Sequence, residues 1–238
     1  MHNILVLLRK EWRESLRNKM VLFGALFLPA FMVGAALFMI VQGQGVDIPG
    51  AQAALFNTAL MYFLVLPAVI PLAIAVYSIV GEKEQQSLEP LLATPVTDLE
   101  LFLGKALASV IPALVITWAS FGLFLGLSIP FAGGVPPHVL TIPWLAAIFG
   151  LTPLLSLTSV GITMIVSSRA SDARAAYQFS SFAILPPIVP LIIYSTRKAL
   201  VSVALVGVEG GVLIVAAVAV LAIAVRLFRR EQILTRWK

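Results

Sequence analysis

Long apolar runs alternate with short polar segments along the chain. An α-helix needs about 20 predominantly apolar residues to cross a hydrocarbon core of about 30 Å. Six runs reach that length: Met20–Val41, Leu55–Val80, Leu99–Leu127, Trp144–Val166, Tyr177–Tyr194 and Gly211–Leu227. The fifth contains Pro186, Pro187 and Pro190, which membrane helices tolerate where neighbouring groups satisfy the freed carbonyls. The pattern predicts an all-α membrane protein with six transmembrane helices.

Two shorter apolar patterns lie outside these runs. Residues 1–19 place Ile4, Leu8, Trp12 and Leu16 at four-residue steps, which predicts a cytoplasmic amphipathic helix suited to the inner leaflet surface. The stretch "TRKALVSVALVGVEGG" before the sixth run has an apolar part too short to cross, so we expect a re-entrant or interfacial element there. The remaining segments are too short to bury a core. The chain is therefore expected to be one transmembrane domain, residues 1–238, ending in a cytoplasmic tail, 228–238.

Composition and charge agree with a membrane location. Hydrophobic residues make up 60% of the chain and charged residues only 11%, whereas about a quarter of a soluble domain is charged. Fourteen of the 16 Lys and Arg residues fall on one side of the six predicted spans. Because cytoplasmic loops carry the excess of Lys and Arg, both termini are predicted to be cytoplasmic, in a cell membrane. The net charge of +5 is then a topology signal and needs no nucleic-acid partner.

The segment "GEKEQQSLEPLLATPVT", residues 81–97, lies between the second and third runs. Ser87 can cap a short helix that has Pro90 in its first turn and ends at Pro95. Thr97 and Glu100 have the spacing of a capping box for the third span.

The short helix has a leucine face with nothing in its own loop to cover it. Leu88, Leu91 and Leu92 share this face. The membrane interface or a partner protein must cover it. Interfacial helices are typically rich in Lys and Arg, whereas this segment is acidic, which favours a protein partner.

The same segment resembles the cytoplasmic loop of the type-2 permeases of ATP-binding-cassette (ABC) transporters, including the sodium and drug exporters. The shared features are a Glu-rich entry, a Leu-x-x-Leu-Leu-like core and a "TPV" exit. In that family the loop is a coupling helix that docks on a nucleotide-binding subunit. The resemblance implies an exporter subunit that pairs with a second permease and binds separate ATPases, which hold ATP and Mg. It also implies that the coupling contacts are Glu82, Lys83, Glu84, Leu88, Leu91, Leu92 and Pro95.

Several polar side chains inside the predicted spans are candidates for a translocation path. Thr152, Ser156, Ser159 and Thr163 follow one face of the fourth span. The alternative, which we favour, is a close-packed helix interface in which hydroxyls bond across. The other candidates are Asn57, Tyr62, Trp118 and Gln178. Each of these alone is more often a packing residue than a cargo contact.

Missing motifs narrow the function. No "GxxxxGK[ST]" phosphate loop and no "HExxH" or "GxSxG" motif is present, so we expect neither an ATPase nor a membrane hydrolase, and no catalytic, metal or cofactor site. An ion-coupled carrier is disfavoured because no ionisable side chain falls in the middle of a predicted span. The remaining alternative is a membrane scaffold or regulator that recruits a cytoplasmic protein through residues 81–97.

The cargo stays open. Sodium-exporting members of the family often have a large extracellular insertion after the first span, where this chain has only "QGQGVDIPGAQA". Sodium is therefore not favoured over drugs, peptides, lipids or haem-like molecules.

Overall fold

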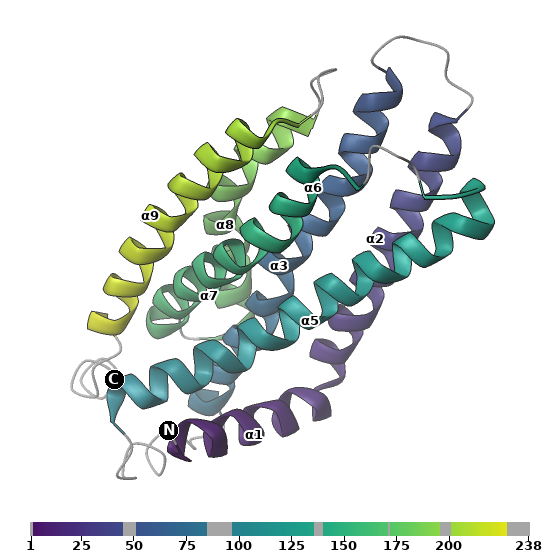
Figure 1. The fold of residues 1–238 in the computed structure, drawn as a ribbon. Coiled ribbons are helices and arrows are strands. Elements are labelled where there is room, and N and C mark those ends of the chain that lie inside the picture. The colour runs from purple at the N-terminus through teal and green to yellow at the C-terminus, as the bar shows by residue number, and fades with distance from the viewer. Residues whose placement is uncertain are drawn as a thin grey trace.

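The computed structural model describes residues 2–44, 51–84, 97–135, 140–170, 172–195 and 201–227, and its regular elements there are all helical. Figure 1 shows long helices packed side by side into an elongated bundle, with α1 lying along one end. The helices are α1 (His2–Arg17), α2 (Lys19–Gly43), α3 (Ala51–Glu84), α5 (Asp98–Ala132), α6 (Ile142–Ala146), α7 (Thr152–Arg169), α8 (Ala173–Ser195) and α9 (Val203–Leu227).

Five helical segments are long and apolar enough to cross a membrane: Val21–Gly43, Ala54–Gly81, Leu99–Ala132, Ile142–Arg169 and Val203–Arg226. They correspond to the first four and the sixth of the predicted runs. The fifth run forms α8, which is helical through Pro186, Pro187 and Pro190. Because α8 is not among the five segments, the sixth crossing stays a prediction.

The last span differs from the prediction at its start. A separate re-entrant or interfacial element was expected before Gly211, but the described part of that stretch, from Val203 on, is the first part of α9 itself. Ser202 explains the early start, because its Oγ accepts a hydrogen bond from the backbone N–H of Leu205 at 3.3 Å. The longer helix also brings Glu209, which is only 4% exposed, inside the span.

Helix α3 is the centre of the packing. It contacts α2, α5, α7 and α8, and 78% of its apolar window is buried, against 22% for α2 and for α9. Phe63 on α3 packs against Phe121 and Phe124 on α5, with ring centroids 5.5 and 5.1 Å apart. The core of the domain therefore lies around α3.

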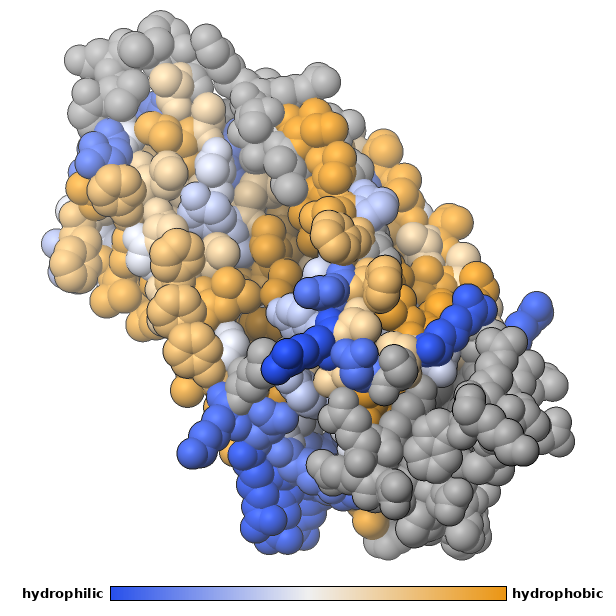
Figure 2. All heavy atoms as spheres, turned by 180° about the vertical axis from the view of Figure 1, so that it is seen from behind, coloured by the Kyte–Doolittle hydropathy of each residue, from blue (hydrophilic) through white to orange (hydrophobic). Residues whose placement is uncertain are grey.

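The outside of the bundle is strongly apolar. Phe23, Phe27 and Phe31 stack along α2 with centroid separations of 5.0 and 6.3 Å, and all three are more than half exposed. Figure 2 shows apolar residues over most of one face, whereas hydrophilic residues gather at its lower end. This distribution is that of a protein whose solvent is largely lipid.

The fourth predicted span contains an irregularity that its sequence pattern did not predict. A π-helical turn, Ala147–Leu151, joins α6 to α7. Pro153 has no N–H to donate to the carbonyl of Phe149, which favours a locally wider turn. Trp118 on α5 donates from Nε1 to the Ile148 carbonyl at 3.3 Å and to Thr152 Oγ1 at 3.1 Å. A side chain from a neighbouring helix thus satisfies part of the irregular backbone.

Candidate functional site

In the sequence the segment connects α3 to α5, and the end of α3 and the beginning of α5 lie at the end of the bundle where α1 lies (Figure 1). Glu82, Lys83 and Glu84 form the last turn of α3. Leu88, Leu91, Leu92 and Pro95 lie outside the described residues, so the coupling helix itself stays a prediction. What the structure describes is how its two flanks are fixed.

Helix α5 begins at a complete capping box, as its sequence predicted. The Thr97 side chain accepts from the Glu100 backbone N–H at 3.2 Å, and Glu100 Oε2 accepts from the Thr97 N–H at 3.0 Å. Two backbone donors at the helix start are thereby satisfied. The position where the chain enters the third span is therefore defined by local hydrogen bonds.

A buried ion pair joins α5 to α1. Lys105 Nζ lies 2.8 Å from Glu11 Oε1, and the side chains of these residues are 0% and 2% exposed. The same ammonium donates to the carbonyl of Ser78 at 2.6 Å and to Ser78 Oγ at 3.0 Å. The three ammonium hydrogens match these three acceptors. One lysine thus connects α1, α3 and α5.

Two further contacts hold α1 along the first turns of α5. Trp12 donates from Nε1 to the Ala108 carbonyl at 3.1 Å. Leu7 lies so close to Gly104 that a Cβ at residue 104 would come within 3.0 Å of the Leu7 Cβ. The absence of a side chain at Gly104 therefore allows the close approach of the two helices.

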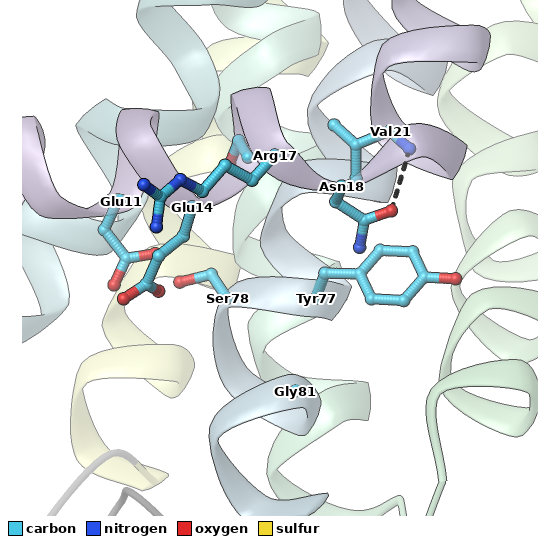
Figure 3. A pocket seen from close by; sticks show the side chains of 9 residues that line it. Glu11, Glu14, Arg17, Asn18, Val21, Tyr77, Ser78 and Gly81 are labelled. Carbon is cyan, nitrogen blue, oxygen red and sulfur yellow. Dashed lines mark hydrogen bonds between the residues drawn. The ribbon is translucent and has the colours of Figure 1, made fainter. Parts of the chain in front are cut away.

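A pocket of about 340 Å³ opens beside the ion pair, between α1 and α3 (Figure 3). Figure 3 shows the carboxylates of Glu11 and Glu14 near Ser78, with Asn18 and Tyr77 farther along the pocket. Asn18 lies between α1 and α2, and its Oδ1 accepts from the Val21 N–H at 3.3 Å. The pocket therefore adjoins both the ion pair and the junction with the first span. No group of three or more acidic or His side chains able to hold a metal occurs in the part of the chain that the structure describes.

Most of the seven candidates for the translocation path are buried within this chain. Asn57, Thr152, Ser156 and Ser159 are buried, Tyr62 is partly buried, and Trp118 and Gln178 are exposed. The structure brings Trp118 and Thr152 together, as described above. Ser159 on α7 donates to the Ala68 carbonyl on α3, which is the cross-helix bond expected for a packing interface. A role in cargo movement stays a prediction for all seven residues.

The sequence reasoning missed the residues that hold this end of the bundle. It placed Ile4, Leu8, Trp12 and Leu16 on an apolar face suited to the inner leaflet surface. It did not identify the face that packs on the bundle, where Leu7, Leu8 and Glu11 are buried. A lone lysine six residues inside an apolar run was the available signal for Lys105.

Two buried ionisable side chains lie inside candidate spans, although neither lies in the middle of one. Both Lys105 and Glu209 are buried within candidate spans. Each lies only six residues from the start of its span, Leu99–Ala132 or Val203–Arg226, so the prediction about the middle of the spans is not contradicted.

The comparison with protein families identifies the family of the chain. A model described as ABC-2 family transporter protein matches residues 5–206, which is most of the chain and extends from the first turns of α1 to the first turn of α9. No curated protein matches the chain. Members of this family are membrane components of transporters and are not themselves the ATPase. Their partner, in general, is an ABC ATPase. The chain belongs to the ABC-2 family of transporter proteins.

Proposed function

We propose that the chain is the membrane-spanning permease subunit of an ATP-driven ABC exporter. Two permease copies, or this chain and a paralogue, would enclose the translocation path at their interface. Two ATPase subunits, holding ATP and Mg, would bind the 81–97 segments. Closure of the ATPases on ATP would move the coupling helices, and the second and third spans would then rock and switch access to the path.

The observation that carries the proposal is the position of residues 81–97 in a chain of this family. The segment joins α3, the most buried helix of the bundle, to α5, whose start is fixed by the capping box. A force applied there acts on the core of the domain. The export direction rests on the family resemblance, in which export predominates.

The alternative is a membrane scaffold that recruits a cytoplasmic protein through the same leucine face without transport. The two functions share the docking segment and differ in the partner. A partner that hydrolyses ATP supports the permease, and a partner without ATPase activity supports the scaffold.

The test is purification of the tagged chain from its native membrane in mild detergent, followed by an assay for vanadate-sensitive ATP hydrolysis. The variant changes Leu88, Leu91 and Leu92 to Ser. A matched control changes Leu140 and Ile142 to Ser, because both apolar side chains are exposed and Ile142 begins α6, which lies away from α1 (Figure 1). We expect the ATPase to elute with the native chain and the control and to be lost from the triple variant. A native chain that elutes without an ATPase would contradict the proposal.

A further inference from the structure

The buried cluster formed by Glu11, Ser78 and Lys105 is outside the segment that the proposed function uses, and it joins α1 to the two helices that flank that segment, α3 and α5. Ser78 lies six residues before the end of α3, and Lys105 lies seven residues after the start of α5. At 1.5 Å per residue both are within about 11 Å of the flanks of residues 85–96. Lys105, on the helix that follows the segment, therefore also binds Ser78 on the helix that precedes it.

The contacts at Lys105 fix the position of α1 more narrowly than apolar packing could. Apolar burial favours contact between helices without itself selecting a direction, because the hydrophobic effect is non-directional. A buried ammonium whose donors are all used cannot slide, since a shift by one helical turn would leave it without its carboxylate in a low-dielectric interior. The Glu11–Lys105 pair thus selects one register of α1 on α5.

Helix α1 in turn leads directly into the first span. Asn18 is the one residue between α1 and α2, and its side chain caps α2 at Val21. Since only Asn18 separates the two helices, a displacement of α1 also displaces the beginning of α2. On the other side of α1, Arg9 and Arg13 are exposed.

We infer that Lys105 is a positioning residue of the transport cycle: it makes α1 move as one body with the ends of α3 and α5, so that movement of residues 85–96 reaches the first span as well as the second and third. The inference rests on the proposed function for the source of the movement. Lys105 itself contacts neither nucleotide nor cargo in this account.

Cysteine cross-linking measures the register of α1 directly, because the native chain contains no cysteine. The pair is Leu7→Cys with Gly104→Cys. A Cβ at residue 104 would lie 3.0 Å from the Cβ of residue 7. Disulfides join Cβ atoms about 3.5–4.5 Å apart, so a small relaxation suffices. The full-length chain is oxidised mildly in membranes, and the fraction of thiols protected from a maleimide is measured.

Three variants are compared in this background. Lys105→Met removes the ammonium. Glu11→Met/Lys105→Met removes both charges at similar volume, and it replaces the single variant in the comparison if that variant fails to fold. Lys10→Met is the matched control, because Lys10 pairs with Glu14 on the exposed side of α1 at 3.7 Å. We expect cross-linking to fall at least threefold in folded Lys105→Met and in the double variant, and to be unchanged in Lys10→Met.

The second readout is ATP hydrolysis by the co-purified complex, without the added cysteines. The positional role predicts that the double variant still binds the ATPase, but that hydrolysis per bound ATPase changes at least fivefold from the native value. Native cross-linking and native hydrolysis in a folded double variant would overturn the inference. If no ATPase elutes with the native chain, the proposed function fails, and the cross-linking still decides whether Lys105 sets the register of α1.

Discussion

Gly161 on α7 faces Val220 on α9 so closely that a Cβ at residue 161 would lie 2.6 Å from Cγ1 of Val220. Real Cβ atoms essentially never approach this near. The missing side chain therefore allows these two helices to pack, in the way small residues do at membrane helix interfaces.

The first prediction is that Gly161→Ala destabilises the domain. Forcing an extra methyl into a packed interface costs about 1–3 kcal/mol, which exceeds the gain of up to about 1 kcal/mol in helix propensity. We expect a lower thermal melting temperature in detergent, recovered in Gly161→Ala/Val220→Ala. As a control, Gly24→Ala on α2 meets nothing within 4 Å and should not lower it. Equal effects at the two glycines would contradict the packing argument.

The second prediction concerns the energy of the buried pair. Removing one partner of a buried ion pair costs about 3–5 kcal/mol, because the other charge is left uncompensated. Replacing both with apolar side chains of similar volume is often neutral. We therefore expect Glu11→Met and Lys105→Met to lower the unfolding free energy strongly when made alone, and the double variant to recover much of the loss. Additive losses, measured by denaturant titration, would show that the two charges are not coupled.

Whether a feature of the fold or of the site could be predicted from the sequence depends on how far apart along the chain the interacting residues lie. The apolar runs predicted the positions of the long helices, and the spacing of Thr97 and Glu100 predicted the capping box, because both signals are local. The pairing of Glu11 with Lys105 joins residues 94 positions apart. It depends on how α1 is rotated about its axis. The four-residue steps of apolar residues predicted a face for the inner leaflet and did not show which face packs on α5. A contact of that kind follows from packing and cannot be read from periodicity.

The third prediction is that Thr97→Ala frays the start of α5. Loss of an N-cap side chain costs about 0.5–2 kcal/mol, and here it removes the acceptor for the Glu100 N–H. Hydrogen exchange of the backbone amides of Glu100 and Leu101 should accelerate. Thr97→Ser keeps the hydroxyl and should exchange at the native rate. A native rate in Thr97→Ala would mean that the cap does not define where the segment enters the span.

The fourth prediction tests the support of the π-helical turn. Trp118→Phe keeps an aromatic ring near Phe149, 5.7 Å away between centroids, but loses the donor to Ile148 and Thr152. The net loss of a hydrogen bond is about 0.5–1.5 kcal/mol. We expect faster hydrogen exchange within Ala147–Leu151, and a larger loss of unfolding free energy in Trp118→Ala, which also loses the ring contact. Equal losses of unfolding free energy in the two variants would show that Trp118 stabilises the protein only through its hydrogen bonds and not through the ring contact.

The fifth prediction is that α8 crosses the membrane, so that the chain has six spans. Single cysteines report the side of each loop, since the native chain has none. Arg174→Cys is exposed at the start of α8, and Val203→Cys is exposed at the start of α9. If α8 crosses, a membrane-impermeant maleimide added to intact cells labels residue 203, and it labels residue 174 only after permeabilisation.

Two further single cysteines calibrate the labelling. Arg13→Cys and Leu140→Cys are exposed and separated by the three spans in α2, α3 and α5, so they must lie on opposite sides. The excess of Lys and Arg predicts that residue 13 is cytoplasmic and residue 140 is outside. Labelling of residue 203 with the pattern of residue 13 would show that α8 does not cross. The protein would then have five spans, and the end of α9 would face outward, away from the ATPase that the proposed function requires.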